Sequence, residues 1–371
     1  MFNITNRIRF YKMGNIEINT TVGCRVDCDF CPQTLLMDKY SSQANIENVS
    51  YGNPVLMSFE NFKTCLDKLP KEVTISFGGL SEPFLNPECS KMIVYAHESE
   101  HSISVFSTLV GMTLEDVKQL EHIPFDTFVI HLPDEPMYAK IAVNKNYIEV
   151  LKKLLSSNIK NIKGMTMGPL HPKIKEVLDT EIEEDVMISR AGNLENVKNN
   201  FKKKLGPLSC NIASKQSLED KLDYNQLLPN GDVILCCNDY GLQNILGNLL
   251  ESDYESLFHS EAFKKIREKM KSHDSDIICR NCEESIPESE LIERRNIVKN
   301  YSGNSSANSL IQLYQNLLER SPDKEGFDYF YSKISNGELT IQNVEDSIKE
   351  SYEYTSSNPN KSRLGPKISK N

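Results

Sequence analysis

Segments with the pattern of β-strands and segments with the pattern of helices alternate along the first half of the chain, and this alternation constrains the fold most. The strand-like segments are apolar and cover 16–22, 73–79, 102–109, 127–133, 162–168 and 185–190. The helical patterns lie near 58–69, 87–99, 113–121, 147–156 and 172–179. Such alternation gives right-handed crossovers and a parallel sheet, with functional residues at the carboxyl ends of the strands. The sequence therefore predicts an α/β fold with six parallel strands in a barrel-like arrangement.

Three cysteines with the spacing CxxxCxxC follow the first of these segments. Cys24, Cys28 and Cys31 lie on one short loop, and Phe30 adds an apolar wall just before the last of them. Three thiolates can hold three irons of a [4Fe–4S] cluster and leave the fourth iron open to bind and reduce a small molecule. The alternative is a structural zinc site, which needs four ligands, but no fourth Cys or His lies within thirty residues of Cys31.

The triad resembles that of the radical S-adenosylmethionine (SAM) superfamily, whose members carry CxxxCxxC, usually with an aromatic residue before the third cysteine, on the loop after the first strand of a partial (β/α)6 TIM-like barrel. The resemblance implies such a barrel in residues 1–195. It also implies that the reduced cluster cleaves SAM to methionine and a 5′-deoxyadenosyl radical, which takes a hydrogen atom from a substrate.

A second stretch, FGGLSEPFLNP at 77–87, is similar to the motif with which this superfamily holds the methionine ammonium group of SAM. The resemblance implies this role for Gly78, Gly79 and Glu82, although a glycine pair before a helix is also common in turns. Ser107 and Thr108 end the 102–109 strand, where family members often bind the ribose of SAM. The other interpretation is that these two hydroxyls only cap the strand end.

Four further cysteines, Cys210, Cys236, Cys279 and Cys282, have a spacing that can complete a fully ligated [4Fe–4S] cluster suited to moving electrons. Asn230-Gly231 predicts a hairpin turn just before Cys236. The step from Gly231 to Cys236 and the final CxxC resemble SPASM and Twitch auxiliary-cluster domains, here predicted at 196–299. No cysteine follows Cys282, which matches the single-cluster Twitch pattern, while a long gap after Cys210 departs from the SPASM spacing. A four-cysteine zinc site is the alternative.

If the auxiliary cluster accepts an electron from the substrate radical, the net reaction is a two-electron oxidation, in which a base takes a proton. Arg190 and Asp239 are the candidate catalytic residues, because both are expected between the barrel mouth and the auxiliary domain. His131, Asp134 and Glu135 are further candidates without distinguishing support. The predicted substrate is a sugar, cyclitol or related small metabolite. The alternatives are thioether formation or epimerisation in a peptide and a non-catalytic, metal-stabilised binding protein.

Charge and composition limit the partners. Lys and Arg number 42 and Asp and Glu 52, so the net charge of −10 gives no reason to expect nucleic acid or an anionic membrane. No signal-like region and no run of eighteen apolar residues occurs in the 371 residues, and clustered cysteines in such a chain indicate metal ligation in the cytoplasm. The expected partners are a small-molecule or peptide substrate and an external electron donor such as flavodoxin or ferredoxin.

The composition changes near residue 300. A Ser/Asn/Gly-rich stretch at 301–309 predicts a linker, and three amphipathic helical patterns follow it. Residues 300–357 resemble a small helical domain of unknown function, with LERSPDKEG near its centre and SYEY at its end. Residues 358–371 have basic but no acidic residues and are expected to be a disordered tail.

Overall fold

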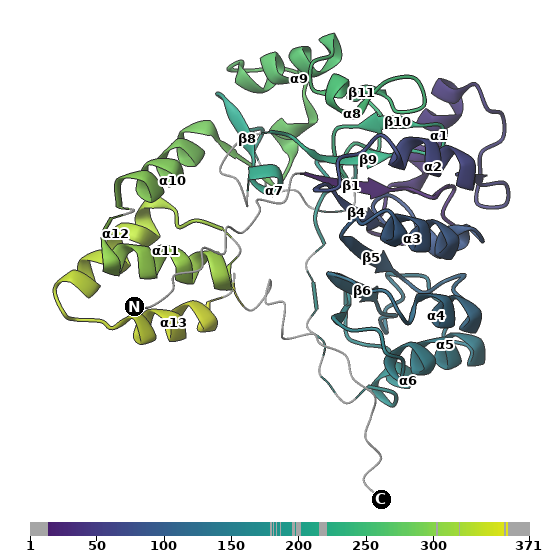
Figure 1. The fold of residues 1–371 in the computed structure, drawn as a ribbon, viewed down its shortest axis with the longest axis horizontal. Helices are drawn as coiled ribbons and strands as arrows, with labels where there is room; N and C mark the ends of the chain where they lie inside the picture. Colours follow the sequence, from purple (N-terminus) through teal and green to yellow (C-terminus); the bar gives the residue numbers. More distant parts are fainter. Residues whose placement is uncertain are drawn as a thin grey trace, which may run out of the picture.

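An eight-stranded sheet lies at the centre of the protein (Figure 1). The computed structural model describes residues 14–178, 180, 182, 184–185, 187–194, 197, 202–214, 221–301, 303–318, 320–351 and 354, so the predicted tail at 358–371 lies outside the described residues. In spatial order the strands are β11 (Ile245–Asn248), β10 (Asp232–Ile234), β9 (Tyr224–Leu227), β1 (Asn15–Ile18), β4 (Thr74–Phe77), β5 (Ile103–Ser107), β6 (Thr127–His131) and β7 (Ile162–Met165). The six strands from β9 to β7 are parallel, whereas β10 and β11 are antiparallel to their neighbours. The predicted α/β class is confirmed.

The sixth parallel strand is not the predicted one. In its described residues the segment 185–190 forms no strand, and Glu184 makes a single parallel bridge to Thr166. The amide and hydroxyl of Ser189 donate instead to Glu283, at 2.6 and 2.5 Å, and Arg190 and Ala191 have positive φ angles of 52° and 57°. The chain therefore turns where a strand was expected. The sixth strand is β9, which pairs with β1 at the other side of the sheet.

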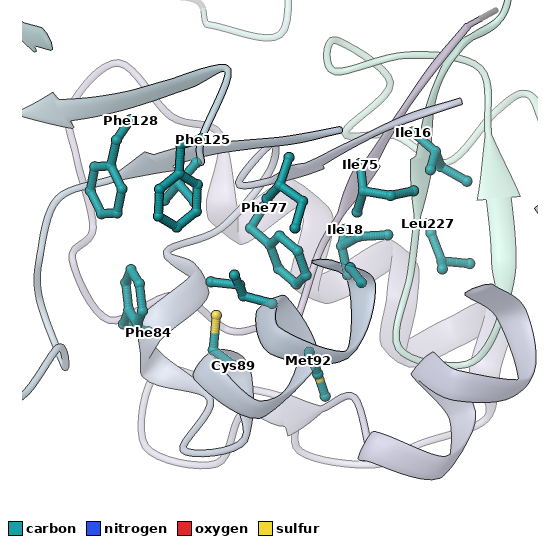
Figure 2. Close-up of a cluster of buried hydrophobic side chains, with 14 of the residues drawn as sticks. Ile16, Ile18, Ile75, Phe77, Phe84, Cys89, Met92, Phe125, Phe128 and Leu227 are labelled. Carbon is teal, nitrogen blue, oxygen red and sulfur yellow. The ribbon is translucent and has the colours of Figure 1, made fainter. Parts of the chain in front are cut away.

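Helices cover one face of the sheet. These are α2 (Phe59–Leu66), α3 (Cys89–Glu98), α4 (Leu114–Leu120) and α5 (Lys145–Leu155), with the short η1 (Pro83–Leu85) and α6 (Pro172–Lys175) in the connections. Every second residue of β1 and β4 is apolar on this face, so Ile16, Ile18, Ile75 and Phe77 are fully buried (Figure 2). Burial of these side chains against α3 holds the helix layer on the sheet.

The opposite face of the same strands is polar. Asn15 and Glu17 on β1 share it with Ser76 on β4 and with Tyr224 and Gln226 on β9, as the strand register requires. The face continues on β5, where Phe106 keeps 37% of its surface exposed within the sheet. Most of the polar side chains of this face are buried, and in folds of this class ligands bind at the carboxyl ends of the strands.

The cysteine triad lies between β2 (Thr21–Val22), which pairs with β3 (Val55–Leu56), and α1 (Gln33–Ala44). The sequence patterns did not indicate this helix. Its residues Leu36 and Tyr40 are buried with Val22 and Tyr240 in a second apolar cluster, separate from the main core. This apolar cluster holds the cysteine loop in place where the loop joins α1.

The auxiliary cysteines come from a smaller region after β7. It contains β8 (Leu208–Cys210), α7 (Asn211–Ser214), α8 (Tyr254–Leu257), α9 (Glu261–Lys271), η2 (Ile278–Asn281) and β12 (Ser285–Pro287), in addition to the hairpin of β9 and β10. The predicted turn at Asn230-Gly231 connects these two strands, and Gly231 has a φ of 87°. Because β9 joins β1, this hairpin is part of the central sheet.

Four helices follow: α10 (Glu288–Tyr301), α11 (Ser305–Leu317), α12 (Lys324–Ser335) and α13 (Ile341–Glu350). They share their own core, which includes Leu310, Tyr314, Phe327 and Val344, and lie apart from the helices on the sheet (Figure 1). The predicted linker at 301–309 is wrong in extent, because Asn304 caps α11 by accepting from the amide of Ala307 at 2.9 Å and the helix begins at Ser305. None of the described helices has the length and apolar character needed to cross a membrane.

Candidate iron–sulfur sites

Cys24, Cys28 and Cys31 lie together on the loop at the carboxyl end of β1. A backbone hydrogen bond of 3.0 Å from Cys31 to Cys28 closes the turn between the last two. Burial raises the pKa of the Cys24 thiol to about 12, and it also raises the pKa of Cys28. The raised pKa values favour the protonated thiols of Cys24 and Cys28, whose protons metal binding would release.

Phe30 forms the apolar wall that the sequence predicts. It is buried, and its ring stacks on His131 at the end of β6, with 4.9 Å between centroids and 3° between planes. Burial lowers the pKa of His131 to about 4, so this imidazole is neutral near pH 7. Within the described chain, His131 Nε2 is buried without a hydrogen-bond partner. The Arg190 guanidinium also reaches this loop, donating from Nε to the carbonyl of Phe30 at 3.5 Å.

Glu82 brings together the residues predicted to bind SAM. Its carboxylate is buried and accepts hydrogen bonds from Ser107 Oγ at 2.8 Å, from the amide and hydroxyl of Thr108 at 2.5 and 2.6 Å, and from the Phe84 amide at 3.1 Å. Burial raises the pKa of Glu82 to about 7, and these donors act in the opposite direction. The carboxylate therefore links the loop after β4 to the end of β5, beside the triad.

Gly79 packs against polar side chains of the inner face. Its φ is 82°, and an added Cβ would lie 3.0 Å from Asn19 Oδ1 and 2.2 Å from Gln226 Oε1. A larger residue would therefore displace this network and strain the backbone. Gly78 precedes it, with φ 154° and Phe106 on the neighbouring strand in close approach.

A chain of hydrogen bonds runs from the inner face to the triad. Gln226 Nε2 donates to Glu17, Asn19 Nδ2 donates to Gln226 Oε1 at 3.1 Å, and the Leu80 amide donates to Asn19 Oδ1 at 2.6 Å. Gln33 Nε2 then contacts both the Leu80 carbonyl and Cys31 Sγ, the latter at 3.4 Å. The SAM-type loop and the cysteine loop are thus one connected polar structure.

The four predicted auxiliary cysteines line a single cavity. Cys210 ends β8, Cys236 follows β10, and Cys279 and Cys282 flank the end of η2. The remaining walls are mostly apolar and include Leu222, Leu235, Met270 and Ile278, and Cys237 lines the same cavity. Asn238 Nδ2 donates to Cys282 Sγ at 3.4 Å. No two of the ten cysteines, all within the described residues, form a disulfide.

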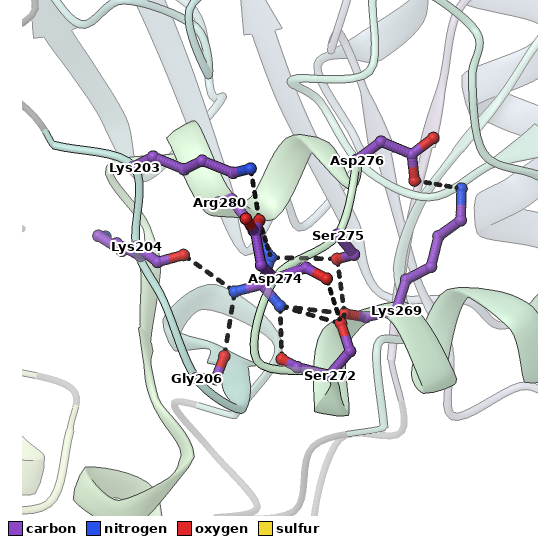
Figure 3. Close-up of polar contacts among 9 residues, drawn as sticks. All are labelled: Lys203, Lys204, Gly206, Lys269, Ser272, Asp274, Ser275, Asp276 and Arg280. Atoms are coloured by element: carbon purple, nitrogen blue, oxygen red, sulfur yellow. Dashed lines mark hydrogen bonds and ion pairs between the residues drawn. The ribbon is translucent and has the colours of Figure 1, made fainter.

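Arg280, inside the CxxC pair, is almost fully buried and fixes this pair in place (Figure 3). Its guanidinium donates to the carbonyls of Lys204 at 2.9 Å, Gly206 at 3.0 Å and Ser272 at 2.6 Å, and to Ser275 Oγ at 3.0 Å. It also reaches the carbonyl of Lys269 in the last turn of α9 at 3.2 Å, where the helix dipole favours a cation. One side chain thus joins three segments around Cys279 and Cys282.

The two candidate catalytic residues are in different situations. Arg190 lies near Glu17, Cys31, Cys237 and Tyr240; burial disfavours its charge, but these neighbours hold its pKa above the ordinary value. Asp239 is fully buried and accepts from the amides of Gln243 at 2.9 Å and Asn244 at 2.8 Å. Its carboxylate therefore organises the loop that follows Cys236, and the structure gives it no contact with Arg190.

Sequence reasoning did not single out Glu17, Asn19, Gln33, Gln226 and Tyr240. Glu17 is buried beside Arg190 and accepts from Tyr224 at 2.9 Å, and burial raises its pKa. The available signal was the alternation of polar and apolar residues in NIEIN, which places Asn15, Glu17 and Asn19 on one face of a strand.

Across the described part of the chain, no three His, Cys, Asp or Glu side chains stand close enough to hold one metal ion. The numbers of cysteines, three at one site and four at the other, are those expected of an open and of a fully ligated iron–sulfur cluster.

A family model matches the segment that carries three of the four auxiliary cysteines, Cys236, Cys279 and Cys282, whereas Cys210 lies before it. Residues 221–283 match SPASM, an iron–sulfur cluster-binding domain, and residues 289–358 match DUF4214, a domain of unknown function. No curated protein matches the chain.

Solved structures with a similar arrangement include those of three proteins. BtrN in complex with AdoMet and 2-DOIA is 17% identical, with a TM-score of 0.48 over 70% of this chain and 88% of that one. Streptococcus suis SuiB bound to the precursor peptide SuiA is 12% identical, with a TM-score of 0.45 over 69% and 67%. Native anSMEcpe with bound AdoMet is 12% identical, with a TM-score of 0.43 over 72% and 86%. From its matched domains, the chain is a SPASM-domain protein with a C-terminal DUF4214 domain, in agreement with its resemblance to radical SAM enzymes of the SPASM/Twitch kind.

Proposed function

We propose that this protein is a radical SAM oxidoreductase of the cytoplasm, in which residues 1–195 bind SAM, residues 196–299 hold an auxiliary cluster and residues 300–357 form the helical domain. The observation that carries the proposal is the presence of two unlike cysteine sites, one of three thiols beside a buried carboxylate network and one of four thiols around a cavity. A cytoplasmic location keeps these thiols reduced.

Cys24, Cys28 and Cys31 would hold the SAM-binding [4Fe–4S] cluster. Bound together, the cluster and SAM supply a 5′-deoxyadenosyl radical, a chemistry that no protein side chain offers. Gly78 and Gly79 let the backbone approach the methionine end of SAM. Glu82 orients this loop through its bonds to Ser107 and Thr108 and brings a negative charge close to the expected ammonium group.

Cys210, Cys236, Cys279 and Cys282 would hold the auxiliary [4Fe–4S] cluster. Four protein ligands leave no open iron, so this site suits electron transfer. The apolar cavity walls limit solvent at the cluster, and Asn238 donates to the sulfur of Cys282.

The substrate we propose is a hydroxylated small molecule, such as a sugar or cyclitol, whose alcohol is oxidised. The support is the polar face of the sheet, where Glu17, Tyr224 and Gln226 form a hydrogen-bonded network beside Arg190. Arg190 is suited to bind an anionic or hydroxyl group there, and Glu17, with its raised pKa, is suited to accept the alcohol proton. Asp239, whose carboxylate accepts from the amides of its own loop, is the second candidate for this role.

The test is anaerobic reconstitution with iron and sulfide, followed by reduction with SAM present. We expect about eight irons per chain, two clusters of four, and formation of 5′-deoxyadenosine. The Cys28→Ala variant should form none, whereas Cys65→Ala, which removes a buried cysteine of α2 outside both sites, should retain the activity. Zinc in place of iron, or 5′-deoxyadenosine from Cys28→Ala, would contradict the proposal. Hydrogen transfer from a supplied peptide instead of a cyclitol would replace the substrate class with peptide modification.

A further inference from the structure

Tyr240 connects the SPASM segment to the cysteine triad. It lies four residues after Cys236, and its side chain is only 1% exposed. Its hydroxyl lies 3.4 Å from Cys31 Sγ, within hydrogen-bond distance of a sulfur. A residue from the auxiliary region therefore touches a ligand of the other site.

The loop around Tyr240 is built to hold this contact. Asp239 accepts from the amides of Gln243 and Asn244, and the Leu235 amide donates to the carbonyl of Asn244 at 3.0 Å, which closes the loop. Gln43 of α1 donates to the carbonyl of Leu242 at 3.0 Å and ties the loop to the helix that follows the triad. The buried Asp239 thus has a structural reason for its position.

The aromatic ring is also confined. Tyr240 packs in the apolar cluster with Val22, Leu36 and Leu80, so its hydroxyl has little freedom to leave the sulfur. Gln33 Nε2 also donates to the same sulfur, at 3.4 Å. Two side chains from distant parts of the sequence therefore converge on Cys31.

Hydrogen bonds to cluster sulfurs change the reduction potential, because a donor stabilises the extra negative charge of the reduced cluster. We propose that Tyr240 is a positioning residue through which the SPASM segment raises the reduction potential of the cluster at the triad. The inference rests on the proposed function, since it requires a cluster on Cys24, Cys28 and Cys31.

The test is a redox titration of the reconstituted full chain, followed by electron paramagnetic resonance. The signal of interest is the one that disappears in Cys24→Ala. In Tyr240→Phe the reduction equilibrium of this cluster should shift about tenfold towards the oxidised form, which is about 59 mV for a one-electron couple. The iron–thiolate stretching bands in resonance Raman spectra should shift in the same variant.

Tyr40→Phe is the matched control. Tyr40 belongs to the same apolar cluster and is equally buried, and within the described chain its hydroxyl makes no hydrogen bond to a cysteine of the triad. We expect the reduction potential of the triad cluster and the resonance Raman spectra of Tyr40→Phe to equal those of the parent protein. An equal potential in Tyr240→Phe, with the cluster present, would overturn this inference alone. If no iron signal depends on Cys24, the proposed function and the inference both fail.

Discussion

The triad comes from a single loop of the chain, whereas the auxiliary cysteines come from three separate segments. Cys24, Cys28 and Cys31 lie within eight residues of each other, but Cys210, Cys236 and Cys279 are brought together by β8, the β9–β10 hairpin and η2. A local site can leave one corner of a cluster open, with Glu82 and the inner face beside it. The auxiliary cysteines line a cavity with mostly apolar walls. The difference teaches that three cysteines from one loop suit a cluster with an open iron, whereas four cysteines from three segments suit a fully ligated one.

The largest effect is expected when the closed site is removed and the open one kept. In Cys279→Ala/Cys282→Ala the iron content should fall to about half of some eight irons per chain. Formation of 5′-deoxyadenosine should continue, because Cys24, Cys28 and Cys31 are unchanged, while oxidation of the substrate should stop. Iron analysis and product chromatography measure both. Substrate oxidation at the parent rate would rule out electron transfer through the auxiliary site.

A smaller but still severe effect is expected for Arg280→Met. The change leaves several buried carbonyls without their donor, so the free energy of unfolding should fall by about 2–4 kcal/mol, and iron should be lost first from the auxiliary site. Lys265→Met, an exposed change on α9, is the control and should match the parent protein. Denaturant unfolding and iron content are the measurements. Equal loss of iron from both sites would show that Arg280 does not act on the auxiliary site in particular.

The carboxylate beside the triad should give the protein a distinct pH dependence. Burial raises the pKa of Glu82 from 4.5 to about 7, so the folded state binds a proton that the unfolded state releases above pH 4.5. Its contribution to stability is thus fully present below pH 4.5 and is lost as the pH rises to about 7, by up to about 3 kcal/mol. Unfolding of the metal-free protein across this range should show the slope, and Glu82→Gln should reduce it, while Glu17 and Asp239, whose pKa values burial also raises, keep a part of it. An unchanged slope in Glu82→Gln would assign it to another group.

The smallest effect distinguishes the two adjacent cysteines of the auxiliary cavity. Cys236 and Cys237 both line it, but Cys237 also lies near Glu17 and Arg190 on the side of the inner face. Cys237→Ala should therefore keep the full iron content, whereas Cys236→Ala should lose the auxiliary cluster. Iron analysis and the absorbance near the cluster bands compare the two variants. The reverse result would exchange the ligand assignment.

Features with a local physical cause could be predicted from the sequence. The hairpin at Asn230-Gly231 was predictable because the turn needs a positive φ, and the wall at Phe30 because it is next to Cys31. The strands β4, β5, β6 and β7 follow the predicted segments, since their apolar faces repeat in the sequence.

Features that depend on distant partners could not be predicted. The strand expected at 185–190 does not form, because the Ser189 amide donates to Glu283, 94 positions later in the sequence, instead of to a neighbouring strand. Arginine is usually a surface residue, so the sequence of the CxxC loop gives no sign that Arg280 is buried. Its burial is explained by the carbonyls that accept its hydrogen bonds. Tyr240 contacts Cys31, which lies 209 positions earlier in the sequence, and the residues around Tyr240 give no sign of this contact.

The pairing of β9 with β1 affects how the chain reaches its native state. Glu17 and Gln226, neighbours across these strands, are 209 positions apart in the sequence. During synthesis, β1 therefore has one unpaired edge until residue 227 has left the ribosome, and closing so long a loop slows the last step of folding. An exposed edge of this kind invites pairing with other chains. Truncation before residue 224 would leave that edge of β1 without its partner strand, so we expect the SAM-type region to be less stable without the SPASM segment.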